Sequence, residues 1–210
     1  MKKKTEVKRQ AIVDMAAEVF REKGFDRASM SDIRQRVGGS NATLYNYFPS
    51  KESLFFEVMY QANQAEFAAA HDALDHETDD IAEALQNFGE ALLTLLYSPD
   101  VMAVRRLVTA SFGNCHLGQT CFELGPKRSM AEISEFLLAA MKKGKLRDCD
   151  PNVAALHLRG LLESELLDNF IFQIETNIRP EDIRRYTQRA VAVFMAAYGP
   201  LPASTPAVAG

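Results

Sequence analysis

A short polar and aromatic segment that ends at Lys51 gathers side chains able to recognise nucleic acid. Asn41 and Asn46 each carry an amide that presents a donor beside an acceptor, a pair that can read an adenine edge bidentately. The hydroxyl groups of Tyr45 and Tyr47 can donate to phosphate, and the ammonium group of Lys51 attracts it. The segment therefore has the chemistry of a DNA-binding surface, although a helix with an ordinary solvated face would carry the same residue types.

The spacing of apolar residues predicts the helices that must hold this segment. Residues 12–20 place apolar side chains one helical turn apart, which indicates a first amphipathic helix. Ser29, Ser40 and Ser50 are suitable N-caps for three further helices. The turn at residues 38–40 joins the two shortest of them in a helix-turn-helix pattern. An ordinary helical hairpin is the alternative, and the pattern alone favours neither.

The rest of the chain also shows helical periodicity and no strand-like alternation, so we predict an all-α fold. Apolar residues make up 47% of the 210 residues and charged residues 25%, enough for a packed core. No stretch approaches 18 consecutive apolar residues, which argues against a membrane span. After the first three helices, the expected helices cover residues 51–75, 79–97, 100–114, 126–143, 152–175 and 180–198, with a break at residues 113–118.

Charge divides the chain into a cationic head and an anionic body. Residues 1–51 contain 11 Lys and Arg and 6 Asp and Glu, a balance of +5, whereas residues 52–210 have a balance of −9. Such an asymmetry can hold one end near phosphate and repel the other. We expect a DNA-binding domain over residues 1–50, a helical effector-binding and dimerisation domain over 51–198, and a disordered Pro/Ala-rich tail over 199–210.

Other classes of function find less support. The four histidines form no known catalytic or zinc signature, and there is no Gly-rich phosphate loop, so we expect no enzyme activity, cofactor or metal site. Cys115, His116 and Cys121 could form a thiol or metal sensor on a regulator, but their spacing is incomplete. A helical interaction module without DNA is the remaining alternative. Three cysteines do not suggest a disulfide framework, which fits a reducing cytoplasm.

Residues 40–54, Ser-Asn-Ala-Thr-Leu-Tyr-Asn-Tyr-Phe-Pro-Ser-Lys-Glu-Ser-Leu, strongly resemble the recognition helix and following turn of the TetR family of transcriptional regulators. Residues 16–25 resemble the first helix of that family, and residues 105–172 are similar to the AefR-like C-terminal group. The resemblance implies a homodimer on palindromic double-stranded DNA with an effector-binding body. Gly39 and Arg34 depart from the family pattern, which often has Val and a small residue there.

The resemblance also implies which residues contact DNA. The third helix would lie in a major groove, where Ala42 or the methyl group of Thr43 could touch a thymine methyl. The start of the second helix would approach the phosphate backbone. The predicted DNA-binding residues are Ser29, Met30, Ser31, Arg34, Asn41, Ala42, Thr43, Tyr45, Asn46, Tyr47 and Lys51.

The helix expected over 152–175 is apolar nearly all round, so it must be covered on more than one side. With the helix at 180–198 it is expected to form a four-helix bundle across a twofold axis, burial within one protomer being the alternative. The predicted interface residues are Leu158, Leu162, Phe172, Tyr186, Ala190 and Phe194.

A small apolar or cationic organic effector is expected to bind among the middle helices and to relieve repression. Glu165 and Asp168 lie in an apolar helix. Such a carboxylate is either solvated, paired with Arg159 or another neighbour, or available to a donor group of a ligand, and we expect pairing first. The predicted ligand-binding residues are Phe67, Phe88, Leu92, Leu96, Met102, Leu107, Phe112, Phe122, Phe136, Met141, His157, Leu161, Glu165 and Asn169.

Overall fold

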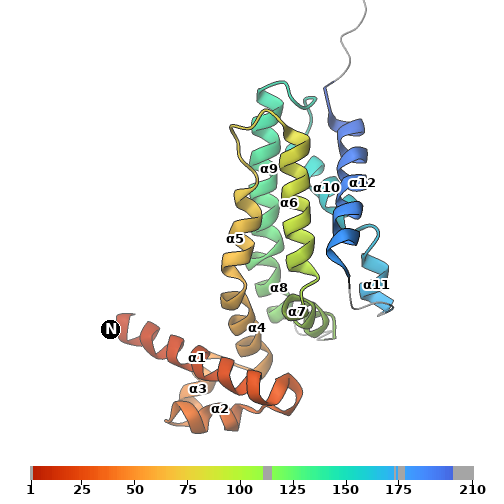
Figure 1. The fold of residues 1–210 in the computed structure, drawn as a ribbon. Helices are drawn as coiled ribbons and strands as arrows, with labels where there is room; N and C mark the ends of the chain where they lie inside the picture. The colour runs from red at the N-terminus through yellow and green to blue at the C-terminus, as the bar shows by residue number, and fades with distance from the viewer. Residues whose placement is uncertain (1, 111–114, 173, 175–177, 201–210) are drawn as a thin grey trace, which may run out of the picture. The chain divides into compact units, whose positions relative to one another are not determined.

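The computed structural model describes residues 2–110, 115–172, 174 and 178–200, and every regular element in these ranges is an α-helix, which confirms the predicted all-α class (Figure 1). The chain forms two compact units. Unit 1 contains Met1–Gln64 and Pro99–Cys121, and unit 2 contains Ala65–Ser98 and Phe122–Gly210. The predicted domain boundary at residue 50 stays a prediction.

Unit 1 holds the helix-turn-helix, and its helices begin where the serines predict. Ser29, Ser40 and Ser50 each accept a backbone hydrogen bond from the first turn of the helix that follows. Gly24 interrupts the first helix with a φ of 73° and a ψ of 164°. The helices of this unit are α1 (Lys2–Arg27), α2 (Met30–Val37), α3 (Asn41–Tyr47), α4 (Lys51–Ala62), α7 (Pro99–Ala110) and the first part of α8 (Cys115–Leu124).

An aromatic core fixes these helices to one another. Phe20 of α1 meets Phe55 of α4 edge to face with ring centroids 5.2 Å apart, and Phe25 lies 4.8 Å from the same ring. Leu44 and Phe48 are each 3% exposed and so are buried as well. Because α3 buries this side, its remaining side chains face outward.

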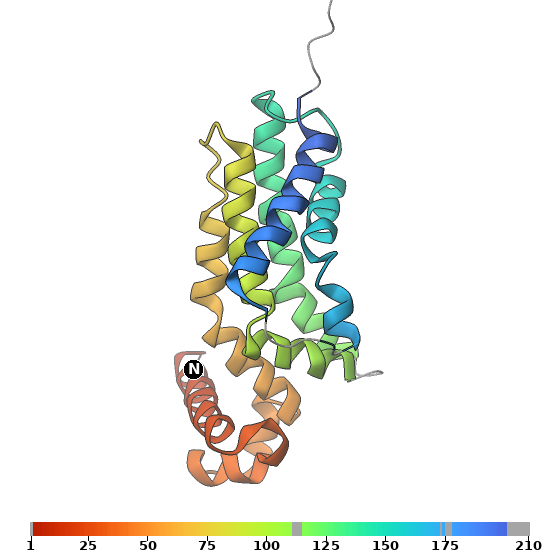
Figure 2. The same ribbon diagram turned by 45° about the vertical axis from the view of Figure 1, so that its right-hand side comes forward.

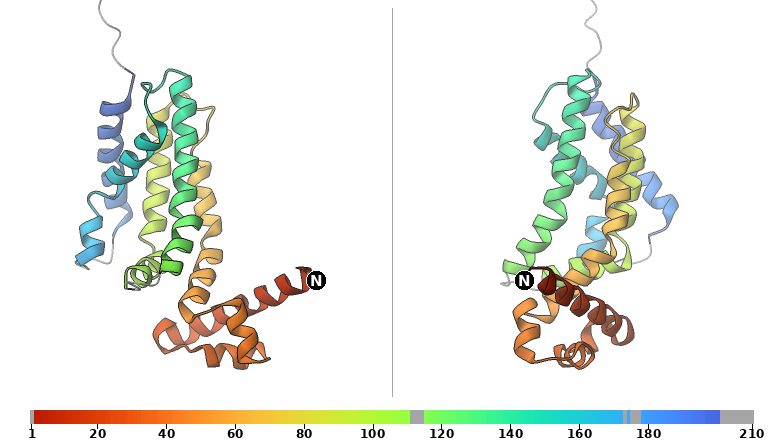
Figure 3. Two further views of the ribbon diagram at one scale, coloured as in Figure 1. Left: turned by 180° about the vertical axis from the view of Figure 1, so that it is seen from behind. Right: turned by 90° about the vertical axis from the view of Figure 1, so that its left-hand side faces the viewer.

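Unit 2 is a helical bundle. Helices α9, α6 and α12 run along it, α10 packs against both α9 and α12, and α12 packs on α6 (Figures 2 and 3). At Gly89 these helices approach closely, because a Cβ atom there would lie 2.5 Å from Cγ2 of Thr187 and 2.7 Å from Cδ2 of Leu162. The helices are α5 (Gln64–Asp72), α6 (Ile81–Leu96), α9 (Pro126–Lys142), α10 (Pro151–Glu163), α11 (Leu167–Phe172) and α12 (Pro180–Tyr198).

Two long helices predicted in the body are each divided in the structure. The helix expected over 51–75 ends at Ala62, where the side-chain amide of Asn63 donates to the carbonyl oxygen of Met59 at 2.8 Å. The helix expected over 152–175 ends at Glu163, and the hydroxyl of Ser164 donates to Leu161 O at 2.7 Å. These side chains compete for helix carbonyls and favour an end at those positions.

The break predicted at residues 113–118 is also wrong in part, because α8 starts at Cys115. Gly118 lies inside this helix without a positive φ, so it has not acted as a helix terminator. Residues 111–114 and the tail at 201–210 lie outside the described residues. None of the helices described is both long enough and apolar enough to cross a membrane.

Candidate nucleic-acid interface

One face of α3 is open to solvent while the opposite face packs into unit 1. Asn41, Ala42 and Asn46 are exposed, and Tyr45 is 49% exposed. Thr43 and Tyr47 are half-buried at the edges of this face. Amide and phenol groups from four positions, Asn41, Tyr45, Asn46 and Tyr47, therefore lie on one surface of unit 1. This is the arrangement that direct reading of base edges requires.

The turn before α3 depends on two consecutive glycines. Gly38 has a φ of 73° and Gly39 a φ of 97°, both in the region that favours glycine. Ser40 then caps α3: its Oγ accepts from the backbone N–H of Thr43 at 3.2 Å and lies 3.0 Å from Thr43 Oγ1. Gly39, which departs from the family pattern, thus supplies a backbone conformation that a valine would adopt only with strain.

The start of α2 is held by a reciprocal capping box. The backbone N–H of Ser29 donates to Oδ2 of Asp32 at 3.0 Å, and the N–H of Asp32 donates to Oγ of Ser29 at 3.1 Å. Lys23 adds an ion pair to Asp32 at 2.8 Å. Ser29 and Ser31 are exposed and Met30 is half-buried, so the structure presents the predicted phosphate-facing turn at the surface.

Because of these partners, the contribution of the Asp32 carboxylate to the free energy of unfolding depends on pH. Its hydrogen bond with Lys23, followed by that from Ser29, lowers the pKa of Asp32 from 3.8 to about 2. A group with a depressed folded-state pKa favours folding above its unfolded value and loses that contribution as pH falls toward the folded value. We expect its carboxyl ¹³C resonance to titrate with a midpoint near pH 2, and Lys23→Met to move that midpoint upward. A midpoint near 4 in the unmodified protein would contradict the capping geometry.

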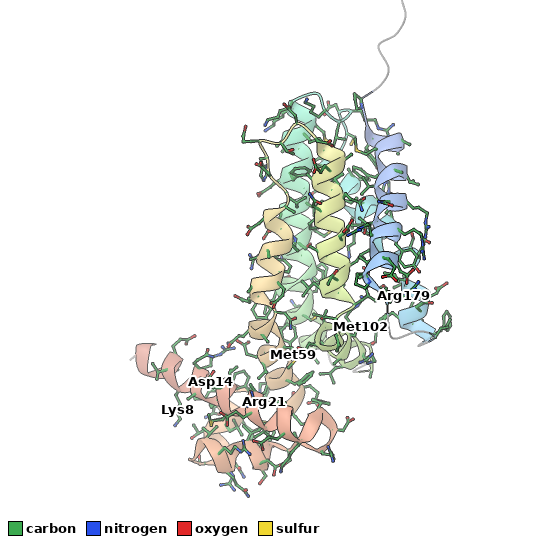
Figure 4. All side chains as sticks on the ribbon, in the orientation of Figure 1. Lys8, Asp14, Arg21, Met59, Met102 and Arg179 are labelled. Carbon is green, nitrogen blue, oxygen red and sulfur yellow. The ribbon has the colours of Figure 1, made fainter. Side chains whose placement is uncertain are left out.

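Cations of α1 and α2 differ in how they are held. Arg36 forms ion pairs with Glu22 and Glu18 of α1. The sequence reasoning missed this cluster, although the two glutamates stand four residues apart. Arg34 is half-buried, and its Nε has no hydrogen-bond partner in the described structure. Lys8 and Arg21 are exposed along α1 (Figure 4). The positive charge of the head is thus partly neutralised before any DNA arrives.

Lys51 begins α4, as predicted, and carbonyl groups of unit 1 bind its ammonium group in the free protein. Its Nζ donates to the carbonyl oxygens of Phe25 at 2.8 Å and Ala28 at 3.1 Å. It also lies 4.2 Å from the centroid of the Phe25 ring. Nearby, Arg9 pairs with Glu57 of α4 at 2.8 Å. Burial opposes ionisation of Glu57, but the hydrogen bonds from Arg9 and Gln61 keep the pKa of Glu57 below its usual value.

The residues predicted to bind an effector are only partly brought together. Phe88, Leu92, Phe136 and Met141 share the core of unit 2, and Leu96 and Leu161 are partly buried against it. Phe67 stacks on the ring of His71 with centroids 4.2 Å apart, and the ring of Phe88 makes an edge-type contact with His71 at 5.2 Å. His71 Nε2 is 2.8 Å from Ser129 Oγ, which forms a buried polar pair among aromatic rings.

Other predicted effector residues lie elsewhere. Met102 and Leu107 belong to α7 of unit 1, Phe122 is 51% exposed, and Phe112 lies outside the described residues. Asn169 is half-buried on α11.

His157 and Glu165 are both exposed, although Nδ1 of His157 is hydrogen-bonded to the hydroxyl of Tyr198, so neither residue fits the prediction of an internal lining. Glu165 instead pairs with Arg189, with Oε1 2.9 Å from the Arg189 Nε, and this contact lowers the pKa of Glu165. The expectation that Glu165 pairs with a neighbour is therefore confirmed, although the partner is Arg189 and not Arg159.

Four of the six residues predicted for the dimer interface are buried within the protomer, as the alternative reading of these helices expects. Leu158, Leu162, Ala190 and Phe194 are at most 5% exposed and belong to the core of unit 2, in which α10 packs on α9 and α12, and α12 packs on α6. Of the other two, Tyr186 is half-buried and Phe172 is 68% exposed. The same helices also carry apolar side chains that face solvent and were not among the predicted interface residues: Val153, Leu156 and Val193 are 43%, 57% and 53% exposed.

The thiol and metal alternative gains no support from the described residues. The side chains of Cys115 and His116 lie outside them, and no group of three or more His, Cys, Asp or Glu among the rest could hold a metal ion. Burial raises the pKa of the Cys121 thiol, while the charge of Arg105 acts in the opposite direction. A thiol with a raised pKa is a poor nucleophile at neutral pH.

Comparison with known proteins extends this description. The chain is 27% identical over 184 residues to the HTH-type transcriptional regulator UidR of Escherichia coli (strain K12), 84% of each protein. It is 46% identical over 54 residues to the uncharacterized HTH-type regulator YvdT of Bacillus subtilis (strain 168), a match that spans 26% of this chain and 28% of YvdT.

Solved structures of similar proteins cover nearly the whole chain. A TetR-family regulator from Mesorhizobium loti MAFF303099 has a TM-score of 0.77 at 27% identity, over 93% of this chain and 98% of that one. The flavonoid-responsive regulator FrrA has a TM-score of 0.69 at 27% identity, over 94% and 100%.

Family comparison accounts for both parts of the molecule. Residues 12–58 match the bacterial regulatory proteins of the tetR family. Residues 83–200, more than half of the chain, match the AefR-like transcriptional repressor C-terminal domain. With the exposed face of α3 and the capped helix-turn-helix that supports it, the chain belongs to the TetR family of transcriptional regulators.

Proposed function

We propose that this regulator is a repressor that binds a palindromic operator as a homodimer and leaves it when a small organic effector binds. The observation that carries the DNA-binding part is the solvent-facing side of α3, with Asn41, Tyr45 and Asn46 exposed over a buried Leu44. In vitro selection from random duplex DNA tests it. The expected product is a palindromic consensus with half-sites about one helical turn, roughly 34 Å, or a multiple of it apart. Selection of no consensus would contradict the proposal.

Asn46→Ala is expected to relax base preference at one position of each half-site. The amide can accept and donate to one adenine, and a bidentate contact of this kind is worth about 1–3 kcal/mol of discrimination. Fluorescence anisotropy on the operator and on duplexes mutated at single positions measures the effect. Asn87→Ala, an exposed asparagine on α6, is the matched control. Equal weakening on every duplex would assign Asn46 to the backbone and not to a base.

The dimer is proposed to form through the outward sides of α10 and α12. Val153 and Leu156 of α10 are exposed apolar side chains, and Val193 lies on the neighbouring α12. Exposed apolar residues in contiguous positions commonly mark an interaction surface. A twofold interface buries the same surface on both copies, so each of these side chains contributes twice.

The effector is proposed to bind in unit 2, where aromatic rings surround a polar pair. Phe67 and Phe88 flank His71, whose ring nitrogen contacts Ser129, and the guanidinium of Arg128 stands 4.8 Å from the Phe67 ring. Apolar walls with a few placed polar groups are typical of small-molecule sites. The similarity to FrrA, a flavonoid-responsive regulator, adds support for an aromatic organic compound.

Release from DNA follows from linkage. An effector that binds better to a form of the protein with weak operator affinity lowers that affinity, and DNA lowers effector affinity by the same factor. A coupling of about 1–3 kcal/mol corresponds to roughly a 5–150-fold change. Titration of the operator complex with a flavonoid, an aromatic quaternary ammonium compound and a long-chain acid tests this. Tighter operator binding in the presence of an effector would reverse the proposed sign.

A further inference from the structure

The ring of His71 in unit 2 is held at both of its nitrogen atoms. Nδ1 lies 2.8 Å from the carbonyl oxygen of Phe67, one helical turn earlier in α5, and Nε2 lies 2.8 Å from Oγ of Ser129 in α9. His71 is 7% exposed and Ser129 is 8% exposed, so water has little access to either bond. The direction of these two hydrogen bonds therefore decides what the buried pair can offer to a third group.

The partners of the ring determine where its proton lies. A carbonyl oxygen can only accept, so Nδ1 of His71 must carry the proton that is donated to Phe67. In a neutral imidazole the other nitrogen is then an acceptor, and the hydroxyl of Ser129 donates to Nε2. The backbone of α5 thus fixes the tautomer, and the tautomer fixes the direction of the Ser129 hydroxyl.

A serine hydroxyl that donates its proton to a neighbour keeps only acceptor capacity. It has one O–H group and two lone pairs. In the part of the chain that the structure describes, no backbone or side-chain group donates to Oγ of Ser129. These lone pairs therefore favour a ligand that supplies an O–H or N–H group.

The charged groups beside the ring favour the same kind of ligand. Oε2 of Glu132 lies 4.0 Å from Nδ1 of His71, and a negative charge at this distance disfavours an anionic ligand. The guanidinium of Arg128 is already paired with this glutamate, with Nε 2.9 Å from Oε1. A carboxylate has no proton to donate, and a quaternary ammonium ion has no N–H group. Neither could form a hydrogen bond to the acceptor that Ser129 presents.

We propose, on the basis of the effector site proposed above, that Ser129 selects the effector by accepting a hydrogen bond from it. The effector is then an aromatic compound with a neutral hydroxyl group, of the phenol class. Phe67 and Phe88, which contact the ring of His71, lie where an aromatic ligand would pack. Aromatic carboxylates and quaternary ammonium compounds are rejected because they lack the donor.

Nitrogen-15 NMR of histidine-labelled protein tests the direction of the bonds without any ligand. At neutral pH the ring of His71, assigned with the help of His71→Gln, should be protonated at Nδ1 alone. Ser129→Ala should keep that proton and shift the Nε2 resonance, because the hydrogen bond to this nitrogen is lost. Ser134→Ala is the matched control, since Ser134 is a buried serine of α9 whose hydroxyl has no hydrogen-bond partner in the described structure. A ring protonated at Nε2, or at both nitrogens, would overturn the inference.

Isothermal titration calorimetry with a hydroxyflavone and its parent flavone, which differ only in the hydroxyl group, tests the selection. At a pH where the phenol is protonated, the hydroxyflavone should bind the unmodified protein about 10-fold more tightly than the flavone or a flavone carboxylate, the effect of one hydrogen bond. Ser129→Ala combined with His71→Phe should bind hydroxyflavone and flavone equally. The second change is needed because alanine alone would leave Nε2 of His71 as a substitute acceptor, and phenylalanine keeps an aromatic ring there.

Ser134→Ala should retain the preference for the hydroxyflavone, and circular dichroism checks that each variant is folded. Equal affinities in the unmodified protein, or a preference that persists in the double variant, would overturn the inference.

These measurements separate failure of the inference from failure of the proposed function. If neither flavone binds, the inferred class of effector is wrong, whereas selection of an operator still decides DNA binding. If the hydroxyflavone binds with the expected preference but leaves operator affinity unchanged, Ser129 selects a ligand as inferred and the proposed release from DNA is wrong.

Discussion

Replacement of Leu156 and Val193 together by glutamate is expected to convert the dimer to a monomer and to abolish specific operator binding. Both side chains are more than half exposed in the protomer, at 57% and 53%, so the substitutions leave the core of unit 2 intact. In a twofold interface they would bury four carboxylates without partners. Each unpaired buried charge costs several kcal/mol, so the dimer dissociation constant should rise by at least about 1,000-fold.

Analytical ultracentrifugation at micromolar concentration measures this change, and circular dichroism checks that the helices remain. Leu138→Glu, on the exposed side of α9 and 39% exposed, is the matched control and should stay dimeric. A double variant that sediments as a dimer would show that the interface lies elsewhere. Loss of operator affinity should follow dimer loss, because two linked half-site contacts bind far more tightly than one.

Phe194→Ala is expected to lower the free energy of unfolding by about 3–5 kcal/mol, the range for large-to-small changes at buried aromatic positions. Phe194 is fully buried and stacks on Tyr198 with ring centroids 4.6 Å apart. Its removal leaves a cavity between α12 and the rest of the core, which close-packed neighbours fill only in part. Urea denaturation at fixed protein concentration measures the loss.

The same variant distinguishes a core residue from an interface residue. The dissociation constant of the folded dimer should change little in Phe194→Ala, whereas Val193→Ala should weaken the dimer and leave the protomer core unaffected. A strongly weakened dimer in Phe194→Ala, with stability of the protomer unchanged, would restore the interface role that the sequence suggested for this position.

Local rules explain why the DNA-binding head was predictable. A serine at the right distance from an apolar stripe gives a helix start, and the caps at Ser29, Ser40 and Ser50 all form as expected. Likewise, Leu44 and Phe48 stand four residues apart, about one helical turn, so the helical period alone separates the buried face from the exposed one.

The body was less predictable because its signals are not local. Leu156 and Leu158 are equally apolar, and only the packing of α10 on α9 and α12 decides that Leu158 is buried and Leu156 is exposed. The helix ends at Asn63 and Ser164 depend on side-chain bonds to the backbone that hydropathy does not reveal. Lys51 was assigned by residue type and position, and its two carbonyl acceptors are visible only once α1 has been folded beside it.

The order in which the chain builds the two units has a mechanical consequence. Unit 1 is completed by Pro99–Cys121 only after the polypeptide has left it at Gln64 and formed α5 and α6. An N-terminal fragment cut at that point would lack α7, which packs on α4, and should bind DNA with a loosened scaffold. The polypeptide crosses between the two units three times. A conformational change in unit 2 can therefore reach unit 1 through three covalent connections.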